Sequence, residues 1–248
     1  MEARRLLLMA MMATTLTSAR RAHAYRPFDS TDASVAAAGE LELEFGPLGY
    51  VQASPRHFLV APSLIVNFGF ARRWELVVQG RDFILLDDLP GEARARLVDT
   101  GAFLKGVLRA GSLQGASGPS IGIEFGVLLP TVQGDPGVGA TAIVIVSGRW
   151  DAATLHVNGA VSRTRAGNAD LFGGVILEGP HRWAVRPVAE LFLDHELGAG
   201  TTYSALLGAI WRARDGLSFD LGARAALAAD VPVLELRAGL TWAILIGR

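Results

Sequence analysis

The sequence predicts an all-β protein, an up-and-down antiparallel transmembrane β-barrel of about 12 strands. Three observations predict it: strict alternation of apolar and polar residues, one strand face almost without charge, and a near absence of lysine. Alternation with a period of two is typical of strands whose two faces meet different surroundings. Residues 40–45, Glu-Leu-Glu-Leu-Glu-Phe, state the pattern, and residues 218–225 repeat it.

The alternating unit recurs along the chain as about ten residues followed by a turn. Such segments bracket the nine to eleven residues with which a tilted strand crosses a bilayer, and an even strand number is typical of bacterial single-chain barrels. We expect strands at 39–51, 57–70, 73–87, 97–109, 119–130, 140–150, 153–163, 169–179, 182–194, 200–213, 216–227 and 231–246.

The two strand faces differ in chemistry. A soluble sandwich or lipocalin-like barrel shows the same alternation with its apolar face inside. Here Lys105 is the only lysine, whereas a solvated face normally carries many, and glycine separates the sparse charges. We therefore place the apolar face in lipid and the polar face in a lumen. In the second strand this assigns to the lipid face Phe58, Val60, Leu64, Val66 and Phe68.

Charged side chains on the polar parity are the candidates for a permeation lining. Away from lipid they must pair with one another or line water. Two interpretations stay open: an ion-pair network that closes a narrow barrel, and a selectivity lining for a solute. The candidates are Glu75, Arg81, Asp99, Lys105, Glu124, Arg186, Glu190, Asp220, Arg224, Glu235 and Arg237.

The five tryptophans provide an orientation. In an up-and-down barrel they all fall toward the rim that holds both chain ends. Tryptophan prefers the membrane–water interface, so a cluster at one rim predicts an aromatic girdle. The girdle residues are Trp74, Trp150, Trp183, Trp211 and Trp242.

Residues 1–24 have the pattern of a secretory signal peptide. A basic start precedes an eleven-residue apolar core, and Ala22-His23-Ala24 provides the small-x-small pattern for cleavage after Ala24. We expect a short periplasmic segment over 25–38 and the barrel over 39–248. Cleavage leaves 19 Lys and Arg against 23 Asp and Glu, so no basic excess indicates a nucleic-acid partner.

The sequence contains no specific catalytic or metal-binding motif. The chain has no cysteine, which excludes disulfides and thiolate metal sites. Asp194-His195-Glu196 contains residue types of a hydrolase, but no second element supplies a nucleophile. Asp87, Asp88 and Glu92 lack the spacing of a calcium loop. We expect no enzyme activity, no cofactor and no metal.

Three short motifs carry a resemblance to a known family. Residues 26–33, Arg-Pro-Phe-Asp-Ser-Thr-Asp-Ala, followed by Gly-Glu-Leu-Glu at 39–42, resemble the start of mature proteins of the "MetA-pathway of phenol degradation" family. Leu-Leu-Pro-Thr at 128–131 resembles that family's central strand and loop, and residues 217–222 with 238–242 its closing hairpin. The resemblance implies an outer-membrane barrel that passes hydrophobic or aromatic compounds. Such barrels usually end on an aromatic residue, whereas this chain ends Ile-Gly-Arg.

The expected function is a passive channel for small solutes in the bacterial outer membrane. The alternatives are a structural barrel with a plugged lumen and, less favoured, a membrane-embedded lipid hydrolase. The expected partners are outer-membrane lipid and the assembly machinery of that membrane, and the expected state is a monomer.

Overall fold

The computed structural model describes residues 26–246, and the predicted signal peptide and the last two residues lie outside this range. It confirms the predicted all-β barrel, with each of the 12 strands within a few residues of its expected position. The strands are β1 (Glu40–Ala53), β2 (Arg56–Ala71), β3 (Trp74–Leu85), β4 (Ala95–Arg109), β5 (Ser120–Leu128), β6 (Gly139–Arg149), β7 (Thr154–Arg163), β8 (Ala169–Glu178), β9 (Val185–Glu196), β10 (Gly200–Arg214), β11 (Leu217–Ala228) and β12 (Val231–Leu245).

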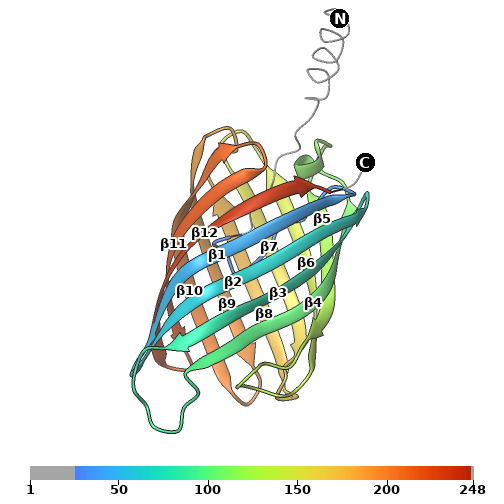
Figure 1. Ribbon diagram of the computed structural model, residues 1–248. Coiled ribbons are helices and arrows are strands. Elements are labelled where there is room, and N and C mark those ends of the chain that lie inside the picture. Colours follow the sequence, from blue (N-terminus) through green and yellow to red (C-terminus); the bar gives the residue numbers. More distant parts are fainter. Residues whose placement is uncertain (1–25, 247–248) are drawn as a thin grey trace, which may run out of the picture.

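Every strand pairs antiparallel with its sequence neighbours, and β12 closes the barrel against β1 (Figure 1). Closure leaves no unpaired edge, as a membrane-spanning sheet requires. Glu40 pairs with Leu245, so the start of β1 and the end of β12 lie at one rim. We call this the Trp rim, since the tryptophans cluster there, and the other end the outer rim.

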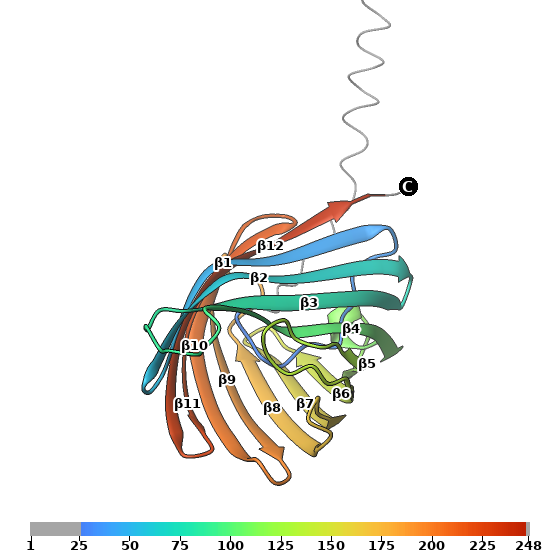
Figure 2. The ribbon, with the colours of Figure 1, turned by 60° about the horizontal axis from the view of Figure 1, so that its bottom comes forward.

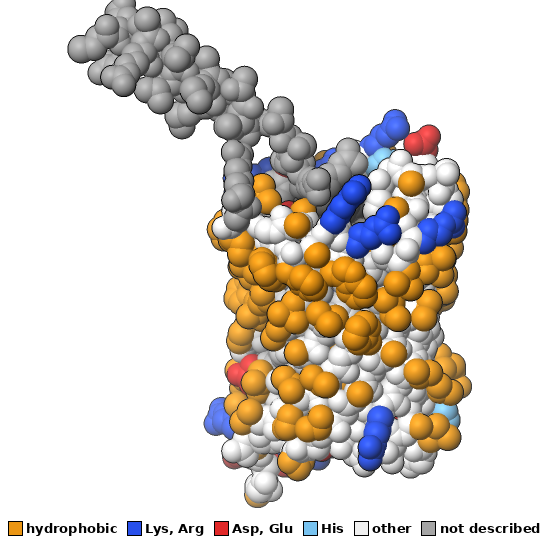
Figure 3. Space-filling model, turned by 90° about the vertical axis from the view of Figure 1, so that its right-hand side faces the viewer, with side chains coloured by type: hydrophobic (Ala, Val, Ile, Leu, Met, Phe, Trp, Pro, Cys, Tyr) orange, Lys and Arg blue, Asp and Glu red, His pale blue; other side chains and the backbone are white. Residues whose placement is uncertain are grey.

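The apolar parity forms the outer surface. Leu207 and Leu221 expose 70% and 65% of their area, while Glu44 and Glu190 on the opposite parity expose 1% each. Apolar side chains cover the face of the barrel seen in Figure 3, and its basic side chains lie mainly toward the two ends. This inversion of a soluble protein's pattern is what a lipid-facing wall requires.

One part of the lipid-face assignment was wrong. A break in the pairing register between Val60 and Ser63 shifts the side-chain parity of β2. Leu64 therefore points outward, whereas Val60 is 5% exposed and lines the interior. A bulge of this kind reverses the faces of the residues on one side of it, because the side-chain period is two.

The segment before β1 differs from the expectation of a periplasmic extension. Residues 26–38, which we call the lumen segment, run inside the ring of strands (Figure 2). Ser30, Asp32 and Ala33 are buried there. Because barrel strands present polar side chains inward, this segment finds hydrogen-bond partners that water would otherwise supply.

The long connection between β4 and β5 folds inward at the Trp rim. It holds a short 3-10 helix, η1 (Ser112–Gln114), and no helix within residues 26–246 is long and apolar enough to cross a membrane. Leu113 of η1 packs with Ala33 and Ile145, and Gln114 donates to the Ala33 carbonyl at 2.8 Å. The connection therefore holds the lumen segment at this rim.

Candidate functional site: the barrel lumen

The lumen segment enters the site at Arg26. Its guanidinium donates to Ser63 Oγ on β2 at 2.7 Å and lies 3.5 Å from the Asp220 carboxylate on β11. The group fits there because Gly46 and Gly239 have no side chain, since a Cβ at either would collide with it. Phe28 then packs on Val188 and Ile210 in the half of the lumen near the Trp rim.

Arg237 is the centre of the largest charge network. It donates to Glu235 at 2.8 Å, to Asp29 at 3.0 Å and to the Pro27 carbonyl at 2.6 Å. Arg224 reaches Glu235 at 2.7 Å from the neighbouring strand. Wall and lumen segment are thus joined by charge-assisted hydrogen bonds, which are stronger than neutral ones.

The middle of the lumen segment is held through its backbone. Glu190 on β9 accepts the amide of Asp29 at 2.9 Å and that of Ser30 at 2.6 Å. Asn158 on β7 binds Thr31 with both ends of its amide, at 3.1 and 2.8 Å. These contacts satisfy buried backbone groups that belong to no sheet.

The only lysine of the sequence lies between the wall and the lumen segment. Lys105 Nζ is 3.5 Å from Glu75 and 3.8 Å from Asp32, with all three side chains almost fully buried. Glu124 lies opposite Lys105 in the pairing of β4 with β5. A buried ammonium of this kind is stable only when carboxylates compensate it.

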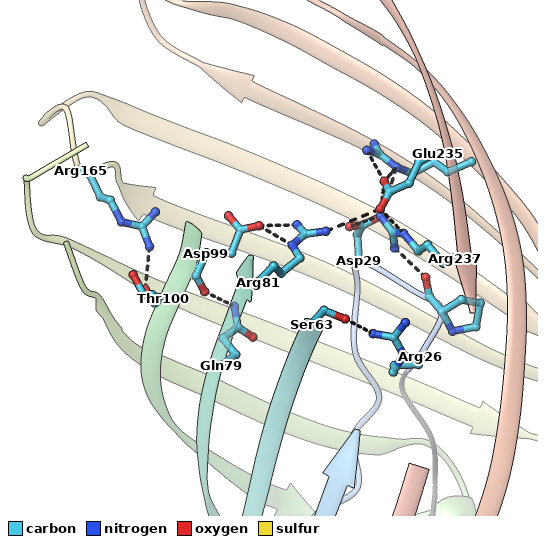
Figure 4. A network of polar contacts seen from close by, with 12 residues as sticks. Arg26, Asp29, Ser63, Gln79, Arg81, Asp99, Thr100, Arg165, Glu235 and Arg237 are labelled. Atoms are coloured by element: carbon cyan, nitrogen blue, oxygen red, sulfur yellow. Dashed lines mark hydrogen bonds and ion pairs between the residues drawn. The ribbon is translucent and has the colours of Figure 1, made fainter. Parts of the chain in front are cut away.

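An open cavity of about 430 Å³ remains between the lumen segment and the outer rim. Figure 4 shows its polar side, where Arg81 lies 2.5 Å from Asp99 and 3.8 Å from Glu235. Arg165, from the connection between β7 and β8, donates to the carbonyls of Leu129 and Thr100. The apolar part of the wall comes from residues such as Val60, Val77, Phe103, Ile143 and Phe172.

The structure brings part of the predicted lining together around this cavity. Six of the predicted residues line it: Arg81, Asp99, Lys105, Glu124, Glu235 and Arg237. Glu75, Glu190, Asp220 and Arg224 instead contact the lumen segment. Arg186 lies apart, 3.2 Å from Glu178, which also accepts from the buried His156 at 2.9 Å.

The tryptophans occupy the ends of the strands at the Trp rim. Trp74 begins β3, Trp150 follows β6 directly, Trp183 precedes β9, and the other two lie near the ends of β10 and β12. Trp150, Trp183 and Trp211 each expose more than half of their area, and Trp242 exposes 43%. Their role as a membrane girdle stays a prediction.

Several lumen residues were missed by the sequence reasoning. Arg26, Asp29 and Asp32 belong to a segment that has no strand pattern, so nothing in its periodicity places it in the barrel. Asp170 and Asp194 line the cavity close to the outer rim. Their inward parity was the available signal: Asp194 follows Glu190 at an even spacing along β9.

The acidic residues of the outer loop after β3 and His195, considered above as weak metal or catalytic motifs, form hydrogen bonds and ion pairs with neighbouring side chains. Asp87 binds His57 through the ring at 3.0 Å, and Glu92 binds Arg56 at 2.6 Å. His195 Nδ1 lies 2.8 Å from Thr201 Oγ1 on the neighbouring strand. Among residues 26–246, no three His, Cys, Asp or Glu side chains converge as a metal site.

Comparison with solved structures places the architecture. An outer membrane channel from Pseudomonas putida F1 aligns with a TM-score of 0.59 at 10% identity, over 88% of this chain and 100% of that one. The NanC porin aligns at 0.58 and 7% identity, over 82% of this chain and 98% of its own. The fold is that of outer-membrane channels.

A third similar structure is the KdgM porin in complex with disordered oligogalacturonate, with a TM-score of 0.53, 11% identity, and coverage of 82% and 98%. No protein-family model matches the sequence, and no curated protein matches it. At these identities the likeness concerns the fold alone, so the activity must be argued from the lumen.

Proposed function

We propose that this protein is a passive channel for small solutes in the bacterial outer membrane. The observation that carries the proposal is the cavity of about 430 Å³ inside a closed barrel, polar within and apolar without. Charged groups in such a position line water or pair with one another. Here they form ion pairs and also line the cavity. The resemblance to the phenol-degradation family supports hydrophobic or aromatic compounds among the solutes.

The proposed orientation follows from the two rims. The Trp rim, where β1 begins and β12 ends, faces the periplasm, and the cavity opens toward the outside. The barrel acts as a monomer in contact with outer-membrane lipid and reaches it through the assembly machinery after cleavage behind Ala24.

A second candidate is a structural barrel whose lumen stays closed. The observation that favours it is the lumen segment, which contacts the wall from β2 to β12 and fills the half near the Trp rim. A channel requires either a gap beside this segment or its displacement. Conductance of the folded protein in a planar bilayer separates the two candidates, since a closed barrel passes no current.

A reversible cross-link identifies the route. A Cβ at Gly122 would lie 3.4 Å from Ala33 Cβ, close to the mean of about 3.8 Å for half-cystines. The chain has no other cysteine, so Ala33→Cys/Gly122→Cys forms a single defined disulfide. A current that appears only after reduction means that the lumen segment moves. An equal current in both states means a fixed gap, and no current in either state rejects the channel.

A further inference from the structure

The charge of the outer cavity is unbalanced. Its lining contains seven acidic side chains, Asp29, Glu44, Asp99, Glu124, Asp170, Asp194 and Glu235, and five basic ones, Arg26, Arg81, Lys105, Arg165 and Arg237. The lining therefore contains two more acidic than basic side chains, in a wall of low dielectric constant. A field in such a confined site is weakly screened and selects among charged solutes.

The basic groups of this cavity already have partners, and four of the five are paired with carboxylates. Arg26, Arg81, Lys105 and Arg237 each lie within 4 Å of a carboxylate. Arg165 is held by two backbone carbonyls at 2.6 Å. An anion entering the cavity would therefore have to displace an existing partner from each of these cations.

Three of the seven acidic groups are in the opposite situation. Glu44 Oε2 is buried and accepts no hydrogen bond from residues 26–246, and the side chains of Asp170 and Asp194 contact each other while neither forms an ion pair with a basic side chain of that range. Glu44 exposes only 1% of its area, and its other oxygen accepts from Asn67 at 2.9 Å. A buried acceptor without a donor costs free energy that a ligand can recover.

Apolar surface adjoins two of these acidic groups. Asp194 lies opposite Phe172 in the pairing of β8 with β9, and Asp170 is two residues before it on the same inward parity. Phe172 and Phe103 both line the cavity. Aromatic rings beside carboxylates attract cations through their faces and receive an apolar body at the same time.

We infer that the outer cavity binds cations, specifically organic ammonium ions whose N–H groups donate to Asp170 and Asp194 and whose apolar body packs on Phe172 and Phe103. The interpretation of this cavity as a permeation site rests on the proposed function, whereas binding of the ammonium ion does not require that it cross the barrel.

Calorimetric titration of the folded barrel in a non-ionic detergent tests the inference with three probes of one shape. We expect benzylammonium to bind, and benzoate and benzyl alcohol to bind at least about tenfold more weakly, because only the ammonium supplies charged donors. Equal or stronger binding of benzoate, or no binding of benzylammonium, overturns the inference without any variant.

Variants locate the site. Asp170→Asn/Asp194→Asn should weaken benzylammonium binding about tenfold or more. The matched control, Asp88→Asn/Asp135→Asn, removes two carboxylates from exposed loops at the same rim, outside the cavity, and should leave binding unchanged. Heat-modifiable migration on gels shows whether each variant folds, and equal losses in both pairs contradict the assignment.

Conductance separates this inference from the proposed function. In a potassium chloride gradient the reversal potential should show a preference for potassium over chloride. The triple variant Glu44→Gln/Asp170→Asn/Asp194→Asn should reduce this preference. Benzylammonium binding without any current refutes the channel and leaves the cavity assignment in place. A current without cation preference refutes the cavity assignment and leaves the channel in place.

Discussion

The backbone amide of Ser30 donates to the Glu190 carboxylate at 2.6 Å, although the two residues are 160 positions apart. The same carboxylate accepts the amide of Asp29. One side chain of the wall therefore replaces the partners that two consecutive amides of the lumen segment would have in a sheet.

Glu190→Ala should loosen the lumen segment. The substitution leaves the buried amide of Ser30 without an acceptor, at a cost of about 1 to 3 kcal/mol, and removes the partner of the more exposed Asp29 amide. We expect faster hydrogen–deuterium exchange over residues 26–38 while exchange in the strands stays slow. Glu92→Ala, in an outer loop, is the control, and unchanged exchange over 26–38 in the Glu190 variant would contradict the assigned role.

Lys105→Met should destabilise the barrel strongly. Lys105 lies 3.5 Å from Glu75, and both side chains are 3% exposed. Removal of one partner of a buried pair costs about 3 to 5 kcal/mol, because the other charge remains buried. Urea unfolding in lipid vesicles, followed by tryptophan fluorescence, measures the free energy of unfolding.

The double variant Lys105→Met/Glu75→Gln tests the cause. If the uncompensated carboxylate is responsible, neutralising Glu75 should recover part of the lost free energy of unfolding. Additive losses in the double variant would mean that the two groups act independently.

The turn between β11 and β12 is strained and should be improvable. Ala229 and Asp230 form this two-residue connection with φ of 45° and 67°. Positive φ at both positions is the geometry of a type I′ turn, which favours asparagine over alanine at the first position. Ala229→Asn should raise the free energy of unfolding by up to about 1 kcal/mol. The same change at Ala213, an exposed strand residue, should give no gain.

The outer loop after β3 should loosen in acid. Hydrogen bonds from the ring and the amide of His57 hold the pKa of Asp87 below its ordinary value. The contact therefore stabilises the loop above the ordinary carboxyl pKa of about 3.9 and loses its effect as pH falls through the lowered value. A spin label on Leu89→Cys, in a chain without other cysteines, should show increasing mobility over this range. Asp87→Asn should raise the mobility at neutral pH and reduce its change with pH, while the Glu92–Arg56 contact of the same loop retains the remaining change.

Periodicity predicted the strands well because each residue of a barrel wall faces either lipid or the lumen. The residue type at each position therefore reflects the side that it faces. Glu40, Glu42 and Glu44 alternate with Leu41 and Leu43 for this reason. Prediction failed where the alternation breaks. The bulge that turns Val60 inward lies between Val60 and Ser63. The number of apolar residues in β2 does not reveal it.

The candidate site was predictable only in its wall. The inward charges of β3, β4 and β12 follow from parity, but their partners in the lumen segment do not. Asp29 and Asp32 lie in a stretch without period, and their positions depend on Arg237 and Lys105, which are distant in sequence. The alternation of residues along one strand does not predict contacts between a segment without strands and a surface formed by many strands.

The route of the lumen segment sets an order of assembly. Its partners range from Ser63 on β2 to Arg237 on β12, and β12 is also the strand that completes the ring. No subset of strands contains the whole binding surface. The segment that is synthesised first thus acquires its complete set of partners only when the last strand closes the ring.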